Sequence, residues 1–422
     1  MQSQAHCQST TEAKLIYAAL ISTYPIYAIG GLYITGSALG WVVLGIVMLR
    51  AFVEGRNVFS SLPIMVWLWI IGMFTMLLAL WIAHAQWSLG TGQTIKSTVG
   101  WAKGWALIAL FPLLGSLVSI KPESLVRAAC IVGKHTAIFG LLTYFLYSLQ
   151  IPGQLFVSPL HILGGAGDVF FNVSLYGINP ETGAGRWQFF APWAPAAGFL
   201  SCILVIFCLQ EQDKTLRNWG VFGCIVMVLL SQSRAGLAIF IAVVPVFLLA
   251  KQLQNPWVLL TLGIFIPIVL VLGEPLFEWV MDSYQQVRES RPESTRVRSM
   301  LENLAVQRWI SEAPVWGHGV VESGSKLVEF MPIGSHHSWF GLLFVKGLVG
   351  LIALAIPMGL SVIYFLFYFQ KNIQARAALC FLIIFLCYSF FENLEILAYL
   401  YWPALFWLGM TFKQIQSRGS YV

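Results

Sequence analysis

The segment LPIMVWLWIIGMFTMLLALWIAH (residues 62–84) contains no Asp, Glu, Lys or Arg. A helix of about 20 apolar residues crosses the hydrocarbon core of a bilayer, where every backbone group must be paired within the protein. The segment therefore predicts a transmembrane helix.

Of the 422 residues, 58% are hydrophobic and 10% charged, whereas a soluble domain has about 25% charged residues. We therefore expect an all-α polytopic membrane protein, and the composition excludes a soluble enzyme and a nucleic-acid-binding module.

About twelve apolar runs of this kind occur along the chain, and we predict a transmembrane helix for each of them: 14–29, 37–53, 62–84, 99–120, 126–149, 189–209, 218–233, 235–250, 257–273, 338–367, 377–393 and 396–412. Lys and Arg gather in the connections on one side of this bundle, at Lys14, Arg50, Arg56, Lys121, Arg127, Lys214, Arg217, Lys251, Lys371, Arg376, Lys413 and Arg418. Basic connections are typical of the cytoplasmic side. Both chain ends are therefore predicted to be cytoplasmic.

Two longer segments, 150–188 and 274–337, then form loops on the outer side of a single membrane domain that comprises residues 1–422. We expect two short amphipathic helices in 274–337. The second starts at Ser294, a residue type favoured at helix N-caps, and carries Arg298 on its polar face. It either contributes to a site above the bundle or only shields the transmembrane core. The cysteines have no CxxC spacing and are typical of buried apolar positions.

Two arginines lie where a predicted helix meets the outer side. Arg234 occurs in LLSQSRAGLAIF (229–240) and Arg186 in GAGRWQFFAPW (183–193). A planar guanidinium group binds phosphate oxygens in a two-pronged geometry, so both could hold an anion, although either could be an ordinary interfacial charge. Glu392 and Glu395 could be counter-ions for these arginines or helix caps. We interpret the remaining charged groups within or near helices as structural: Lys103, Lys134, His135 and Lys346.

Two adjacent histidines, His336 and His337, open the predicted helix 338–367 at the same depth as the arginines. Imidazole has a pKa near neutrality and is the side chain most often used as a general base. Four tryptophans are predicted at that level and could stack on sugar rings or form an interfacial aromatic belt: Trp187, Trp193, Trp316 and Trp339.

Several of these stretches together resemble one family. PVWGHGVVESG (314–324), followed by GSHHSWFGLLFVKGLVGLIAL (334–354), resembles the signature of the O-antigen ligase and O-antigen polymerase superfamily. SQSRAGLAIF, GRWQFFAPWAPAAG and VRSMLEN resemble its arginine-bearing stretches, and the matches follow the family's order over about residues 180–360. The family commonly has His-Asn where this chain has His337-Ser338. We match His337 because its spacing to the following glycines fits better than that of His336.

The resemblance implies a GT-C-like membrane glycosyltransferase of the bacterial inner membrane with its site facing the periplasm. It implies an undecaprenyl-diphosphate-linked glycan as donor, a sugar or lipid A-core hydroxyl as acceptor, inversion at the anomeric centre, and no metal or other cofactor. Arg186, Arg234 and Arg298 would bind the diphosphate and His337 would be the general base. His336, Trp187 and Trp339 would be secondary site residues.

The matched stretches do not separate a polymerase from a ligase, because both need the same donor site and base. Segment 274–337 has six basic and nine acidic residues, a net charge of −3, which suits a phosphate-rich lipid A core poorly and favours a polymerase. A transporter of lipid-linked sugars is a third alternative. Transporters often have internal repeats and charges at mid-membrane, whereas here the charges lie at the outer rim.

Overall fold

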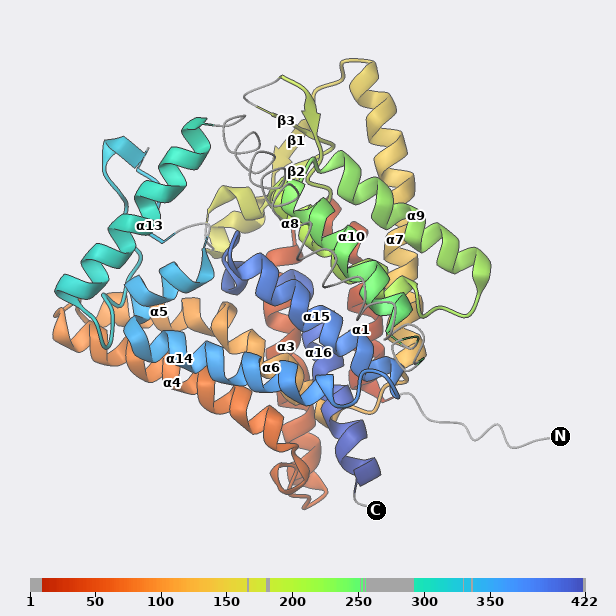
Figure 1. The fold of residues 1–422 in the computed structure, drawn as a ribbon, viewed down its shortest axis with the longest axis horizontal. Coiled ribbons are helices and arrows are strands. Elements are labelled where there is room, and N and C mark those ends of the chain that lie inside the picture. Colours follow the sequence, from red (N-terminus) through yellow and green to blue (C-terminus); the bar gives the residue numbers. More distant parts are fainter. Residues whose placement is uncertain are drawn as a thin grey trace.

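The computed structural model describes residues 10–164, 167–179, 183–250, 252, 255, 292–328, 330–334 and 337–419. The chain is an all-α membrane protein, as predicted, with a few short strands (Figure 1). Its α-helices are α1 (Thr11–Ile21), α2 (Thr23–Ala28), α3 (Leu32–Val53), α4 (Ile64–Gln86), α5 (Thr91–Lys103), α6 (Trp105–Leu117), α7 (Pro122–Ser148), α8 (Ala194–Cys208), α9 (Lys214–Leu230), α10 (Arg234–Leu249), α13 (Pro292–Glu312), α14 (Ser338–Leu366), α15 (Ile373–Ser389) and α16 (Leu394–Gly419). Short 3₁₀ helices occur at Phe59–Ser61, Pro159–Leu163, Asp168–Phe170 and Lys326–Val328.

The predicted number of twelve membrane spans is wrong. Within the described ranges, five segments are long and apolar enough to cross a bilayer: Leu32–Val53, Ile64–Gln86, Thr91–Leu117, Pro122–Ser148 and Ser338–Leu366. Three further apolar helices, α8, α10 and α15, are shorter. A helix rises about 1.5 Å per residue, so one of 15 residues such as α8 is too short for a hydrocarbon core of about 30 Å. The predicted helix 257–273 lies outside the described residues.

Two predicted helices are also interrupted. The run 14–29 divides at Ser22 into α1 and the short α2. The run 99–120 belongs to two helices, because the backbone of Gly104 is not helical and separates polar α5 from apolar α6. Apolar composition continues across the break at Ser22, and the average over 99–120 does not show the change from polar α5 to apolar α6 at Gly104.

The centre of the bundle contains α6 and α16, which lie among α3, α8 and α15 (Figure 1). Glycine permits the closest approach: a Cβ atom at Gly409 would come within 1.9 Å of the Pro112 carbonyl oxygen. Small residues that let two backbones meet are typical of helix packing in membranes. The core therefore depends on close backbone contact as well as on large apolar side chains.

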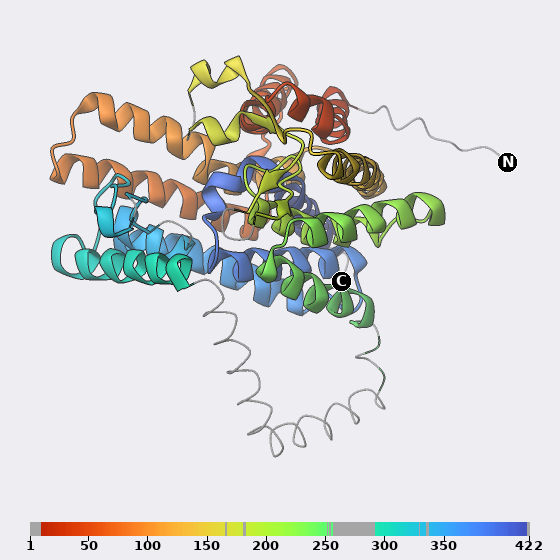
Figure 2. The same ribbon diagram turned by 90° about the horizontal axis from the view of Figure 1, so that it is seen from above.

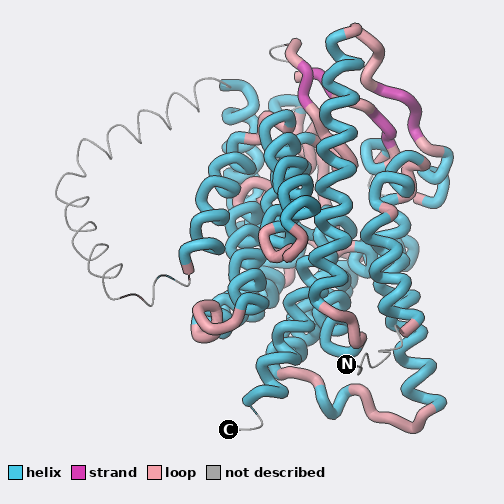
Figure 3. The backbone as a smooth tube through the Cα atoms, turned by 90° about the vertical axis from the view of Figure 1, so that its right-hand side faces the viewer, coloured by secondary structure: helices cyan, strands magenta, loops and turns pink. Residues whose placement is uncertain are grey.

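The predicted outer loop 150–188 contains two small antiparallel hairpins, with β1 (Gln154–Val157) paired to β2 (Asn172–Ser174) and β3 (Gly177–Ile178) paired to β4 (Gly185–Arg186). Figure 3 shows the strands at one end of the bundle. Tyr27 Oη donates to the Ser174 carbonyl at 2.7 Å, which ties the first hairpin to α2. The described part of the loop is therefore attached to the helical bundle.

Several of the predicted cytoplasmic basic residues have acidic neighbours in the structure. Arg50 Nη1 lies 3.1 Å from Glu12 Oε1. Lys14, Lys121 and Arg127 line one cavity, between the start of α1 and the start of α7, together with Glu123, Glu211 and Asp213. Residues far apart in sequence therefore meet there, and the cavity has as many acidic as basic residues.

Helix α14 is broken at Gly347, where φ is 62° and ψ is −162°. The segment 314–319 fills the break by backbone hydrogen bonding. The amides of His318 and Gly319 donate to the carbonyls of Phe344 and Val345, each at 2.9 Å, and the amide of Leu348 donates to the Pro314 carbonyl at 3.0 Å. The loop thereby pairs backbone groups that the broken helix leaves unsatisfied.

Helix α13 lies beside α14 (Figure 2). It begins at Pro292, two residues before the predicted N-cap Ser294. The sequence places Val297, Met300, Leu301 and Leu304 on one apolar face of this helix, and in the structure Val297 and Leu301 are buried against Val328, with Met300 and Leu304 partly buried. The other helix predicted in 274–337 lies outside the described residues.

We expect Gly347→Ala to lower the stability of the protein by about 2 kcal/mol or more, because a positive φ strains any other residue and the new Cβ would lie 2.3 Å from the Val315 carbonyl oxygen. Gly359→Ala in the same helix is the matched control. Its Cβ meets nothing within 4 Å, and alanine favours a helix by up to about 1 kcal/mol over glycine. The measurement is thermal unfolding of the purified proteins in detergent. Equal melting temperatures for wild type and Gly347→Ala would contradict the role of the break.

Candidate functional site

His337 is the residue immediately before α14 and caps that helix. Its Nδ1 accepts a hydrogen bond from the Phe340 amide at 3.3 Å, and its ring packs on Phe340 with 4.1 Å between centroids and edge-on to Phe390 at 5.6 Å. Burial lowers the pKa of His337 to about 4. The imidazole is therefore neutral at pH 7 and, while the cap contact persists, carries its proton on Nε2. His336 lies outside the described residues.

The start of α14 is fixed to the linker that joins α15 to α16. Ser338 Oγ donates to the Glu392 carbonyl at 2.6 Å and accepts from the Leu394 amide at 3.0 Å. Trp339 Nε1 donates to Ser389 Oγ at 2.8 Å. These bonds hold His337, which directly precedes α14, close to Glu392, which follows the end of α15.

Glu392 is the buried carboxylate of this site. Its Oε2 accepts a hydrogen bond from Trp193 Nε1 at 3.0 Å. Burial raises the pKa of Glu392 to about 7, while the charge of Arg298, the bond from Trp193 and the charge of Arg186 act in the opposite direction. Two of the predicted diphosphate-binding residues, from α13 and β4, therefore lie close enough to one carboxylate to stabilise its charge.

The segments that carry Arg186 and Arg234 meet at the turn between α9 and α10. Arg186 Nε donates to the Ser231 carbonyl at 3.2 Å. Ser233 Oγ accepts from the Gly236 amide at 3.0 Å and caps α10, whose first residue is Arg234. The turn thus places Arg234 three residues from the carbonyl that holds Arg186.

The secondary tryptophans differ in their surroundings. Trp187 is 3% exposed, donates from Nε1 to Thr143 Oγ1 at 2.9 Å, and packs against Tyr144, Tyr147 and Tyr176. It supports β4, and thereby Arg186, from within the protein instead of presenting a face for a sugar. Trp339 is half-buried and fixed to Ser389.

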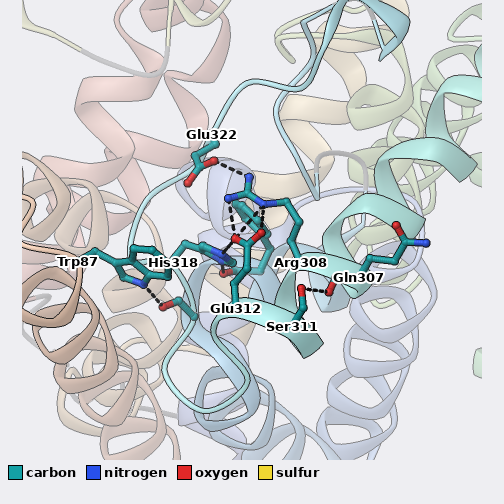
Figure 4. A network of polar contacts seen from close by, with 9 residues as sticks. Trp87, Gln307, Arg308, Ser311, Glu312, His318 and Glu322 are labelled. Carbon is teal, nitrogen blue, oxygen red and sulfur yellow. Dashed lines mark hydrogen bonds and ion pairs between the residues drawn. The ribbon is translucent and has the colours of Figure 1, made fainter.

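A second polar network, which the sequence did not predict, connects α13 to the segment 314–319 (Figure 4). The Arg308 guanidinium binds Glu312 through Nε and Nη2 at 2.8–3.1 Å and Glu322 through Nη1 at 2.5 Å. His318 Nε2 lies 2.8 Å from Glu312 Oε2, and its ring stacks on Trp87. Hydrogen bonds from Arg308 and His318 lower the pKa of Glu312 to about 2. The network holds α13, which carries Arg298, against α14.

The structure therefore gathers Arg186, Arg298 and His337 around the Glu392 linker, next to the turn that begins α10. This arrangement provides guanidinium groups for an anion and a neutral imidazole in one place. No protein-family model matches the chain, and no curated protein matches it either. The functional argument consequently rests on this geometry.

We expect the pH dependence of stability to change in Glu392→Gln. A carboxyl pKa raised from 4.5 to about 7 means that the folded state holds the proton more tightly, so this group's contribution to stability falls between about pH 4.5 and 7, by about 3 kcal/mol in total. His337, with its pKa lowered from 6.5 to about 4, acts oppositely, because the unfolded chain binds the proton more tightly. The melting temperature of the variant relative to wild type should therefore rise from pH 5 to 7 and then level off.

Glu123→Gln, which neutralises an exposed glutamate of α7, is the control for the loss of a carboxylate. Its melting temperature relative to wild type should not vary in this way. A constant difference between Glu392→Gln and wild type from pH 5 to 8 would contradict the raised pKa.

Proposed function

We propose that the protein is a bacterial inner-membrane glycosyltransferase of the O-antigen ligase and polymerase type. It transfers an undecaprenyl-diphosphate-linked glycan to a sugar hydroxyl on the periplasmic side, without a metal. The observation that carries the proposal is the convergence of Arg186, Arg298 and His337 around the linker that contains Glu392. The distribution of Lys and Arg along the sequence supports cytoplasmic chain ends and a periplasmic site.

The arginines provide the site for the diphosphate. Guanidinium groups form two parallel, charge-assisted bonds to phosphate oxygens and do not lose their charge. Arg186 and Arg298 both interact electrostatically with Glu392. Arg234 begins α10, next to the turn whose Ser231 carbonyl binds Arg186. As the bond between the anomeric carbon and the phosphate oxygen breaks, these cations stabilise the negative charge that accumulates on the departing diphosphate.

His337 is the proposed general base. The acceptor oxygen forms a bond to the anomeric carbon opposite the diphosphate, which inverts that centre, and the hydroxyl proton passes to the imidazole. General base catalysis of this kind contributes typically 10²–10⁴-fold. Because Nδ1 accepts from the Phe340 amide in the structure, the neutral ring can take a proton only after that long contact is released. Acceptor binding therefore has to turn the ring.

Glu392 is a second candidate for the base. Its pKa of about 7 matches the requirement that a base be deprotonated near the working pH yet basic enough to accept a proton. It also lies beside the arginines, whereas His337 lies at the N-terminus of α14. The two assignments make different predictions for single variants.

Between the two acceptor classes, we propose a polymerase of O-antigen or exopolysaccharide repeat units, with a ligase for lipid A-core as the alternative. The net negative charge of 274–337 supports this choice. Deletion of the gene distinguishes them: single repeat units in place of long chains indicate a polymerase, and lipid-linked polymer that accumulates without reaching the lipid A core indicates a ligase.

We expect His337→Ala to lower the rate of transfer from a lipid-linked donor by 10²–10⁴-fold without weakening donor binding, measured with the purified enzyme. Arg298→Lys and Arg234→Lys should weaken donor binding, because an ammonium group cannot replace the two-pronged contact. His161→Ala, an exposed histidine in the 150–188 loop, is the control and should transfer normally. Loss of transfer in Glu392→Gln with retention in His337→Ala would move the base to Glu392. Retention in both would refute the proposed chemistry.

A further inference from the structure

A cavity of about 500 Å³ lies between α5, α14 and α16. Three lysines line it: Lys96 and Lys103 from α5, and Lys346 from α14. Glu395, from α16, is the carboxylate among its lining residues. The cavity is therefore cationic overall. The arginine site described above uses none of these groups.

Lys346 is the most unusual of them, because it is 3% exposed within an apolar helix. Among the described residues it makes no hydrogen bond or ion pair, although Glu395 is close enough to act on it electrostatically. Asn393 Oδ1, on the same cavity, is buried and has no hydrogen-bond partner in the described part of the chain. A buried ammonium and a buried amide are both costly when they are left unsatisfied. Both groups would gain partners from a ligand.

The rest of the lining indicates what kind of ligand would fit. Gln93 and Ser97 add polar groups, and Trp101 and Trp105 add aromatic rings. Amide and hydroxyl groups match sugar hydroxyls, and aromatic side chains combine a large apolar surface with a polar edge. Lysine binds phosphate or carboxylate as a point charge. This combination suits a sugar that carries an acidic group.

The cavity adjoins the proposed catalytic region. Ser338 lines it and directly follows His337. The linker between α15 and α16 carries Glu392, beside the arginines, and Asn393, on the cavity, and Glu395 follows in the first turn of α16. Two cationic regions thus flank the start of α14, one formed by arginines and one by lysines.

We propose that the lysine-lined cavity binds the acceptor glycan through an acidic group, a phosphate or a carboxylate, on one of its sugars. The assignment to the acceptor rests on the proposed function, because the arginine region is then occupied by the donor diphosphate. The anion site itself does not depend on that function. The net negative charge of 274–337 does not oppose this assignment, because the residues of that segment that line the cavity are uncharged.

The test is binding of small probes to the full-length protein in phosphatidylcholine nanodiscs without donor. Glucose 6-phosphate and glucuronate represent the two acidic groups, and glucose is the neutral control. We expect at least one acidic sugar to raise the melting temperature and to bind measurably by calorimetry, while glucose at the same concentration does neither. Lys346→Met should weaken this binding at least tenfold, and Lys346→Arg should largely retain it.

A double variant, Lys96→Gln with Lys103→Gln, removes the two lysines that α5 contributes to the cavity and leaves the buried Lys346 unchanged. It tests the proposal even if Lys346→Met fails to fold. Lys326→Gln, an exposed lysine outside the cavity, is the matched control and should bind as wild type does. Equal protection by all three sugars, or unchanged binding in the double variant, would overturn the proposal. Lysine-dependent binding of phosphatidylglycerol in place of either acidic sugar would also overturn it, since the cavity would then hold a lipid headgroup.

The outcome is separable from that of the proposed function. His337→Ala should bind the acidic probe as wild type does, because the probe does not need the base. If His337→Ala and Glu392→Gln both transfer glycan normally while probe binding remains lysine-dependent, the glycosyltransferase mechanism fails and the anion site remains. If transfer depends on His337 and no acidic sugar binds, the acceptor site proposed here is refuted.

Discussion

Guanidinium groups that lie in one region of a protein repel one another unless negative charge lies among them. In this protein Glu392 supplies that charge to Arg186 and Arg298. The carboxylate is itself fixed by Trp193, and its backbone by Ser338. A hairpin, a surface helix and the linker between two buried helices therefore converge at one point. Burial of the carboxylate favours its protonated form, and the arginines favour its charged form, so its pKa records the balance between them.

Helix α13 can bring Arg298 to this point because α14 is broken. At Gly347 the regular hydrogen bonding of the helix is interrupted, and backbone groups of the segment 314–319 bind the helix backbone groups that are left without a partner. His318, in that segment, then reaches Glu312 and holds the end of α13 together with Arg308. The glycine-rich motif thus has a structural explanation of its own. It attaches the outer helix to the bundle.

The sequence predicted the helices from runs of apolar residues, and each predicted run within the described part of the chain corresponds to one or two helices. It did not predict the break at Gly104, because a run defined by its average composition can span a polar and an apolar helix. It did not predict the shortness of α8, because apolar residues also precede the start of that helix. Lys346 was interpreted as structural, since its cavity is formed by residues about 300 positions apart. His318 was missed for the same reason: its stacking partner Trp87 belongs to a distant helix. The sequence could therefore predict which charged residues are unusual, but it could not predict which of them lie close together in the fold.

The break in α14 also constrains how the protein is made. The carbonyls of Phe344 and Val345 are paired with residues that precede them in the chain, and lipid offers no substitute partner. The broken helix can therefore reach its final shape only once residues 314–319 lie beside it. A segment that precedes this span in the chain thus supplies part of its backbone pairing, and the two have to assemble together.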